Sequence, residues 1–196
     1  MVGFPDVVYD LFMAPFEFFF LRRIRKKLIR SATGTVLEIG AGTGANLSYY
    51  QRDAVNSLTI IDLEISDKVK NFHFKTGFPV KFIEGTAEKL PFEDESFDTV
   101  VFTLVFCSVP DPVRGLQEVY RILKPNGKVY FIEHILPEKK LIDPVVHFIT
   151  PAWKKIAAGC YLNRKTLDVL KECGFTHTTT RFLSDFFAGG VAEKIV

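Results

Sequence analysis

The sequence has few cysteines, no long hydrophobic run and no strong excess of one charge. Its 196 residues include three cysteines, an odd number without a Cys-x-x-Cys pair, so neither a disulfide framework nor a structural zinc site is expected. No stretch approaches the roughly 20 apolar residues that span a bilayer. The best candidate, 11–21, is interrupted by Pro15 and Glu17, and its positive charges follow it, unlike those of a signal peptide. We therefore expect a reduced, cytoplasmic protein.

The net charge of +2 is unevenly distributed. Residues 22–30 contain six basic residues and no acidic one. The rest of the chain contains the remaining 19 basic residues and all 23 acidic residues. This balance argues against nucleic-acid binding by a uniformly basic body. Twenty phenylalanines are unusually many for this length and indicate either a large core or an apolar pocket.

Short β-branched runs alternate with amphipathic stretches from residue 35 onward. Strands are predicted over 35–39, 58–62, 80–83, 99–104 and 128–134. The run 99–106 is nearly all apolar, as expected of a strand that helices cover on both faces. The alternation predicts βαβ units and an α/β, Rossmann-like, doubly wound fold over 35–196, preceded by a helical segment, 1–34.

Turn and capping residues mark the ends of the predicted helices. Helices are expected over 64–75 and 111–123, the latter starting at an Asp-Pro pair and stopped by Pro125-Asn126-Gly127.

The C-terminal part continues the pattern. A second Asp-Pro pair at 143–144 marks a helix start, and Asn163 can cap a helix that ends at Gly174. The stretches 176–183 and 191–196 are predicted to form an antiparallel hairpin around residues 188–190. With them the sheet has seven strands, mostly parallel, with helices on both faces.

The segment 16–30, FEFFFLRRIRKKLIR, is apolar first and basic second. Phe20, Ile24 and Leu28 follow helical spacing, with the bases expected on the other face. Two interpretations stay open: a lid helix over a pocket, which we favour, and an interfacial helix in peripheral contact with anionic lipid.

The sharpest motif is VLEIGAGTGANL, residues 36–47. An apolar strand runs into Gly40-x-Gly42-x-Gly44, and a helix is expected to follow. Such glycines permit a tight turn and let backbone amides approach a ligand closely. Asp62 ends the next strand, where a carboxylate can accept both ribose hydroxyl hydrogens.

The glycine loop also satisfies the dinucleotide pattern Gly40-x-Gly42-x-x-Ala45, which leaves a nicotinamide-dependent reductase as an alternative. Glu38, two residues before the first glycine, discriminates between the two ligands. A carboxylate there would repel a pyrophosphate but suits an ammonium or a sulfonium. S-adenosylmethionine carries both groups and no phosphate.

Four motifs follow one another in the order VLEIGAGTGANL, IID, GTAEKLPFEDESFDTVV and LQEVYRILKPNGKVYFIEH. Over residues 35–135 the chain thereby resembles the class I S-adenosylmethionine-dependent methyltransferases, near the ubiquinone/menaquinone C-methyltransferases and phospholipid N-methyltransferases. The stretch 151–175, with TLVFCSV at 103–109 and IEH at 132–134, is similar to the branch containing membrane-associated alkyl-thiol S-methyltransferases.

The resemblance implies S-adenosylmethionine as cofactor and a set of residues that contact it. They are Tyr9, Glu38, Gly40, Ala41, Gly42, Gly44, Asn46, Asp62, Leu63, Thr86, Ala87, Glu88, Thr103 and Leu104. The glycine loop and Glu38 would hold the methionine part, and Asp62 the ribose, with Leu63 beside the adenine.

The remaining contacts complete the implied site. Residues 86–88 would line the adenine edge, residues 103–104 would lie near the methionine part, and Tyr9 would cover the cofactor. Thr86 departs from the family, which commonly has Asp there, and a hydroxyl is a weaker acceptor than a carboxylate.

His134 is the candidate general base, because the fifth parallel strand should end near the transferred methyl group. Its neighbour Glu133 is expected to point to the other face of the sheet. Cys107 is expected to be a packed small residue. No group of His, Cys and Asp has a metal-ligand spacing, so no metal is expected.

The leading hypothesis is a methyltransferase that acts by in-line displacement on a small apolar or lipid-like acceptor, with a thiol as one candidate. Phospholipid N-methylation and quinone C-methylation are the alternatives, and the reductase is less favoured. A non-catalytic cofactor-binding or membrane-associated module is the third class of hypothesis.

Overall fold

The computed structural model describes residues 21–72, 77–139, 141–157 and 159–194. Tyr9 and residues 16–20 lie outside the described residues, so their predicted roles stay predictions. Within the described ranges, no helix combines the length and the apolarity needed to cross a membrane.

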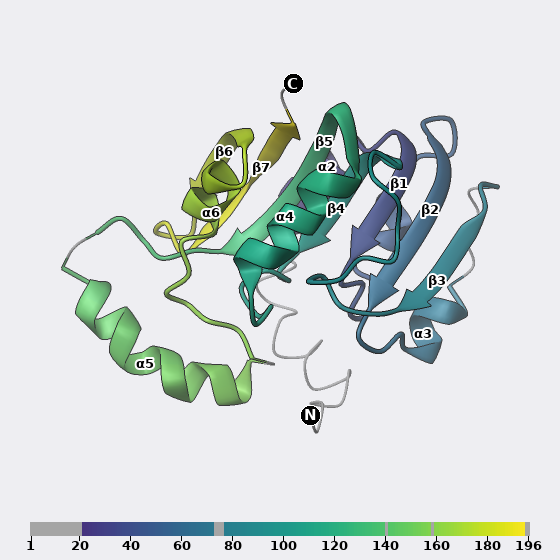
Figure 1. Cartoon of the computed structure of the whole chain (residues 1–196). Coiled ribbons are helices and arrows are strands. Elements are labelled where there is room, and N and C mark those ends of the chain that lie inside the picture. The colour runs from purple at the N-terminus through teal and green to yellow at the C-terminus, as the bar shows by residue number, and fades with distance from the viewer. Residues whose placement is uncertain (1–20, 73–76, 140, 158, 195–196) are drawn as a thin grey trace.

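Seven strands form one sheet in the order β3-β2-β1-β4-β5-β7-β6 (Figure 1). The strands are β1 (Gly34–Ile39), β2 (Val55–Asp62), β3 (Val80–Glu84), β4 (Phe97–Thr103), β5 (Leu123–His134), β6 (Phe175–Phe182) and β7 (Phe187–Lys194). The first five strands pair in parallel, and β7 runs antiparallel to both of its neighbours. The predicted fold class, with its antiparallel C-terminal hairpin, is confirmed.

The helices are α2 (Arg22–Ile29), the 3-10 helix η2 (Leu47–Tyr49), α3 (Asp67–Lys70), α4 (Pro112–Ile122), α5 (Asp143–Ile156) and α6 (Thr166–Glu172). Both Asp-Pro helix starts are confirmed. At α4 the Asp111 side chain accepts a hydrogen bond from the Arg114 amide, 3.0 Å away. Figure 1 shows α4 and α6 in front of the sheet and α2 behind it.

Some predicted helix bounds are wrong. The glycine loop leads into one 3-10 turn, and α3 is shorter than the predicted 64–75 helix. Helix α4 ends at Ile122, because Leu123 already pairs with β4. Asn163 does not cap α6, whose N-cap is Lys165 without a side-chain hydrogen bond.

The C-terminal hairpin turns at a different place from the predicted 188–190. The turn lies between β6 and β7, where residues 183–185 all have positive φ angles. Gly189 and Gly190 lie inside β7 instead, where they pair with Thr180 and Thr179 of β6. A Cβ on Gly190 would clash with the Thr178 carbonyl oxygen, so only glycine fits there. The glycine therefore serves close strand packing rather than a turn.

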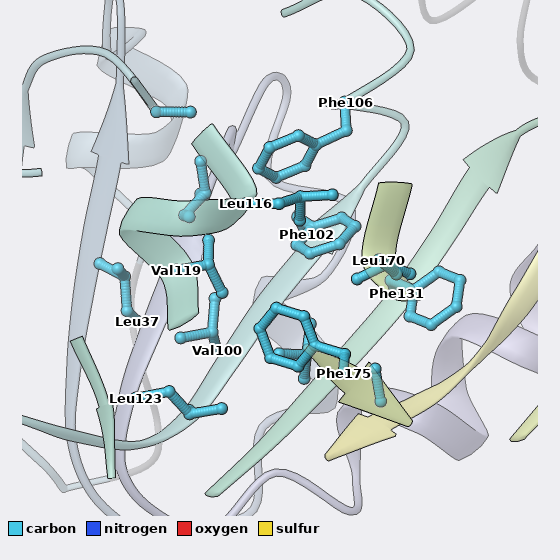
Figure 2. Packing of buried hydrophobic residues seen from close by; sticks show 14 of the residues in the cluster. Leu37, Val100, Phe102, Phe106, Leu116, Val119, Leu123, Phe131, Leu170 and Phe175 are labelled. Carbon is cyan, nitrogen blue, oxygen red and sulfur yellow. The ribbon is translucent and has the colours of Figure 1, made fainter. Parts of the chain in front are cut away.

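Apolar side chains of the strands form hydrophobic clusters on both faces of the sheet. Alternate residues of β4 show the division: Val100 and Phe102 pack with α4 and α6, whereas Val101 packs toward β1 and β2 on the other face. Figure 2 shows the first cluster, in which Phe102 contacts the rings of Phe106 and Phe131. Burial on both faces explains why these strands are nearly continuous apolar runs.

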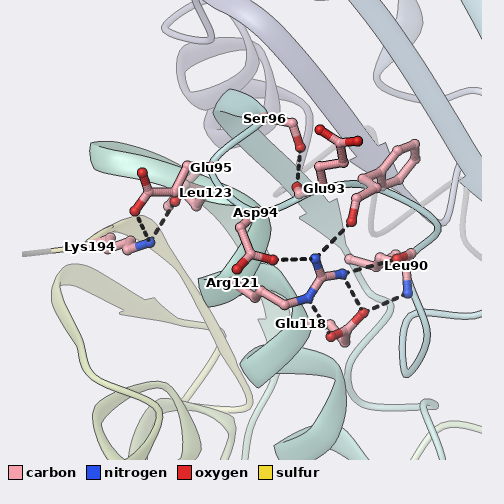
Figure 3. Close-up of polar contacts among 10 residues, drawn as sticks. Leu90, Glu93, Asp94, Glu95, Ser96, Glu118, Arg121, Leu123 and Lys194 are labelled. Atoms are coloured by element: carbon pink, nitrogen blue, oxygen red, sulfur yellow. Dashed lines mark hydrogen bonds and ion pairs between the residues drawn. The ribbon is translucent and has the colours of Figure 1, made fainter.

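Arg121 of α4 fixes the loop between β3 and β4. Its guanidinium donates to both carboxylate oxygens of Glu118 at 2.8 Å, to Asp94 at 2.8 Å and to the Phe92 carbonyl at 2.7 Å (Figure 3). Glu118 in turn accepts from the Leu90 amide. This network holds the segment that carries residues 86–88 against α4.

Phe102→Ala should destabilise the protein by about 3–5 kcal/mol, because it removes a fully buried ring and leaves a cavity. Urea unfolding measures the loss. Val113→Ala is the control: this side chain is 39% exposed, and its truncation should change stability by no more than about 0.5 kcal/mol. A Phe102→Ala loss as small as the control's would contradict the described core.

Candidate functional site

The strand order reverses between β1 and β4, so the crossovers that leave these two strands run in opposite directions. Ligands of doubly wound sheets bind at such a switch point, outside the carboxyl ends of the strands. Gly40 directly follows β1, Asp62 ends β2 and Thr103 ends β4. The structure thus brings Gly40, Asp62 and Thr103, three of the predicted cofactor residues, to the same edge of the sheet.

The glycine loop is tied to β2 by Asp62. One carboxylate oxygen of Asp62 accepts from the Gly42 amide at 3.0 Å, and the other accepts from the Leu63 amide at 2.7 Å. Gly40 has φ +73°, and a Cβ there would lie 2.3 Å from a methyl carbon of Val105. Only glycine fits this position, and the half-buried Asp62 keeps lone pairs for further donors.

The adenine-side residues lie beside Asp62. The Gly85 amide donates to the Asp62 carbonyl at 2.8 Å, which places the loop 86–88 next to the end of β2. Within this group Ala87 is buried, Thr86 is exposed and Leu63 is 65% exposed. Thr86 and Leu63 thus expose surface beside Asp62, and their contact with an adenine stays a prediction.

A buried polar cluster lies beneath the glycine loop. The Asn46 amide donates to Glu38 at 2.9 Å and to the Thr103 hydroxyl at 3.1 Å. The Tyr50 hydroxyl donates to the other oxygen of Glu38 at 2.7 Å. Glu38 is fully buried, so both of its oxygens have protein partners, and Asn46 and Thr103 connect it to the end of β4.

Arg25 of helix α2 also belongs to this buried polar cluster. Its guanidinium donates to the Asn46 carbonyl oxygen at 2.6 Å and to the Thr103 hydroxyl at 2.7 Å, and its side chain is 3% exposed. The prediction that the bases of this segment lie away from the apolar face is therefore wrong for Arg25. Its spacing of four residues from the buried Leu21 and Ile29 is the signal that could have revealed it.

Burial raises the pKa of Glu38 from 4.5 to about 7, although the hydrogen bonds from Tyr50 and Asn46 and the charge of Arg25 act in the opposite direction. Leu104, just after β4, has φ +59°, a left-handed conformation that a leucine rarely adopts. Its amide donates to the Ile132 carbonyl at 2.7 Å, which helps to hold the conformation. Glu38, an ionisable group of raised pKa, and Leu104, with its constrained backbone, thus both lie near the switch point.

His134, the candidate base, lies at the end of β5 in a second cluster with Cys107 and Cys160. Cys160 Sγ is 3.3 Å from His134 Nδ1, and the His134 ring lies 4.1 Å from the ring of Phe187 and 6.3 Å, edge-on, from that of Trp153. Sequence reasoning treated Cys107 as packing and did not single out Cys160. Their separation along the chain leaves no motif that could have revealed the cluster.

The two thiols of this cluster differ in acidity. The neighbouring Cys107 thiol, helped by His134, lowers the pKa of Cys160 below the usual value of a thiol. The adjacent Cys160 sulfur, together with burial and the charge of Glu133, raises the pKa of Cys107.

Glu133 has a structural role that the sequence did not suggest. It is fully buried, and its carboxylate accepts from the amides of Val105, Phe106 and Cys107 at 2.8–2.9 Å. These bonds fix the loop after β4 that carries Cys107. Burial nevertheless raises the pKa of Glu133 to about 7.

Comparisons with known proteins identify the family. Residues 37–131 match the family described as a methyltransferase domain. The thiol S-methyltransferase TMT1B of Rattus norvegicus is 34% identical over 151 residues, covering 72% of this chain and 60% of the relative. The chain belongs to the class I S-adenosylmethionine-dependent methyltransferases.

Other methyltransferases show the range of the similarity. The ubiquinone/menaquinone biosynthesis C-methyltransferase UbiE of Rickettsia prowazekii is 29% identical, covering 74% of this chain and 62% of the relative. A solved S-adenosylmethionine-dependent methyltransferase from Mesorhizobium loti shares the fold, with a TM-score of 0.67, 15% identity and coverage of 87% of this chain and 96% of that one. The chain spans about 60% of the length of these curated relatives.

Glu38→Gln should alter the pH dependence of stability. The folded-state pKa of Glu38 lies above the unfolded value, so the contribution of this group to stability is fully present below about pH 4.5 and is lost as the pH rises through about 7. Glutamine is neutral throughout. Urea unfolding should therefore show the variant gaining stability relative to the wild type between about pH 5 and pH 8, by up to about 3 kcal/mol. A difference that does not change with pH would contradict the burial of an ionisable Glu38.

Proposed function

We propose that this methyltransferase domain transfers a methyl group from S-adenosylmethionine, by in-line displacement, to a small apolar or lipid-like acceptor, with an alkyl thiol as the first candidate. The observation that carries the proposal is the convergence of the glycine loop, Asp62 and Thr103 at the switch point of the sheet. The relative named as a thiol S-methyltransferase supports the choice of acceptor.

The residues at this edge suit the cofactor. Asp62 has acceptor capacity for ribose hydroxyls, and the glycine loop offers backbone close to the ligand. Arg25, Asn46 and Thr103 form the polar floor where the methionine part would lie. The bound cofactor would supply a methyl group already activated by its sulfonium. The chain would orient the two reactants and exclude water from them.

The acceptor decides how much the chain must contribute to proton transfer. A thiol has an unperturbed pKa near 8.5, so it needs little help from a base. A carbon nucleophile needs a positioned base, and His134 is the candidate because it ends β5 among aromatic side chains. Quinone C-methylation is therefore the second candidate, favoured by the similarity to UbiE.

A test of the function uses S-adenosylmethionine with a deuterated methyl group. The purified protein should convert an alkyl thiol into its deuteromethyl thioether, detected by mass spectrometry, in preference to a quinol, a phospholipid or an amine. Asp62→Ala should lower the rate at subsaturating cofactor, because ribose contacts are lost. Transfer to the quinol alone would favour the second candidate, and transfer to none of the acceptors would contradict the proposal.

We also propose a cytoplasmic location. For the segment 16–30, a lid over the pocket stays the favoured interpretation, and the alternative is peripheral contact with anionic membrane surfaces. The exposed bases of α2 support it, whereas the apolar Leu21 and Ile29 are buried against the domain, so the described part of the segment offers charge rather than apolar surface. Cosedimentation with anionic vesicles at low salt tests the contact, and absence of binding there would contradict it.

A further inference from the structure

We propose that Cys107, His134 and Cys160 form a binding site for a soft divalent metal ion, Zn²⁺ in the first place, in which the protein supplies three ligands and leaves the fourth position open. The cluster lies at the end of β5, whereas the glycine loop and Asp62 lie at the ends of β1 and β2. It thus adds a site to the one that binds the cofactor.

The three side chains come from separate elements that the fold brings together. Cys107 lies in the loop after β4, His134 ends β5, and Cys160 lies in the loop after α5. A backbone hydrogen bond of 2.9 Å from the Tyr161 amide to the Cys107 carbonyl joins the two cysteine-bearing loops directly. The positions of the two thiols therefore depend on a direct tie between their loops.

The spacing of the donor atoms suits a tetrahedral ion. The two sulfur atoms and a ring nitrogen of His134 all lie within 4.8 Å of one another, and Cys160 Sγ is 3.3 Å from His134 Nδ1. Around zinc, with bonds of about 2.3 Å to sulfur and about 2.1 Å to nitrogen, tetrahedral donors lie about 3.5–3.8 Å apart. Small side-chain movements would therefore bring all three donors into the coordination sphere.

The donor set also selects the class of ion. Thiolates and imidazole are the ligands of Zn²⁺ and other soft or borderline metals, whereas Mg²⁺ and Ca²⁺ prefer oxygen. The three residues are between 1% and 8% exposed, so the ligands are shielded from solvent. Glu133 accepts hydrogen bonds from three backbone amides of the loop that carries Cys107. These bonds hold in place the backbone that positions this thiol.

Three protein ligands leave a position that an exogenous ligand can take. A thiolate is a soft ligand, so an alkyl thiol would bind there after releasing its proton to solvent. This part of the inference rests on the proposed function, because only a thiol acceptor gives the open position a use in methyl transfer. The metal site itself does not depend on it, but a metal-bound His134 would not be the base considered for a carbon nucleophile.

Cobalt provides the test, because thiolate-bound Co²⁺ gives visible and near-ultraviolet absorption that zinc lacks. The full chain, freed of metal and kept reduced, is titrated with Co²⁺. One equivalent should produce thiolate-to-cobalt charge-transfer bands and the visible bands of tetrahedral Co²⁺, and Zn²⁺ should displace them stoichiometrically. Adding 1-propanethiol should then shift these bands in a saturable manner.

The three cysteines offer a matched set of variants. Cys107→Ser and Cys160→Ser should lose most of the charge-transfer absorption. Cys173→Ser should titrate like the wild type, because Cys173 lies near the Val113 carbonyl on another part of the molecule. Circular dichroism checks that each variant is folded.

The wild-type titration decides the proposal even if a variant does not fold. Absence of charge-transfer bands, or bands that Cys173→Ser removes, would overturn the metal site and leave a hydrogen-bonded thiol–imidazole cluster. Bands that do not respond to the thiol would overturn the open position alone. Neither result bears on deuteromethyl transfer, so failure of this site and failure of the proposed function are distinguishable.

Discussion

Parallel pairing of β1 with β4 is the constraint on which the rest of the structure depends. It places Val36 to Ile39 in register with Thr99 to Phe102 at the centre of the sheet, so that both strands end at the same edge. The chain leaves these strands in opposite directions, and side chains from β1, β2 and β4 converge where it does. Without this pairing Thr103, at the end of β4, would not lie beside Asn46 and the glycine loop that follows β1.

The same geometry explains why so many polar groups are buried at that edge. A buried carboxylate costs free energy unless it has hydrogen-bonding partners, and Glu38 has Asn46 and Tyr50. Arg25 adds a positive charge and reaches Asn46 and Thr103 from α2. A fully satisfied polar network specifies one arrangement of the elements around it. Helix α2, which precedes the sheet, is therefore an integral part of the candidate site.

The centres of the strands were predicted well because the central strands are buried on both faces there and form nearly continuous apolar runs. Strand β5, however, begins at Leu123, five residues before its predicted start. Asp111-Pro112 marked a helix start correctly because capping and a fixed proline φ act within a few residues. Predictions that depended on distant neighbours did worse. The glycines at 189–190 signal a turn locally, yet they lie within β7, where they pair with β5 and β6 and Gly190 lets the backbone of β6 approach closely.

At the candidate site, too, features with a local sequence pattern were predicted and features that depend on distant residues were missed. Asp62 and the glycine loop were predicted from a local pattern, and the structure brings them together through the Gly42 amide. Arg25, Tyr50 and the Cys107–Cys160 pair were missed, since their significance arises only from contacts between elements far apart in the chain. Helical spacing could have revealed Arg25, but no local pattern links Cys107, His134 and Cys160.

The central claim is that S-adenosylmethionine binds where β1, β2 and β4 end. Calorimetric titration with S-adenosylhomocysteine tests it most directly, on the wild type, on Asp62→Ala and on Asp53→Ala, an exposed aspartate before the start of β2. The account predicts saturable one-to-one binding that Asp53→Ala leaves unchanged and Asp62→Ala weakens by about tenfold or more, as expected for lost hydrogen bonds to a charged group. No binding by the wild type at millimolar ligand, or equal affinity in all three proteins, would contradict it.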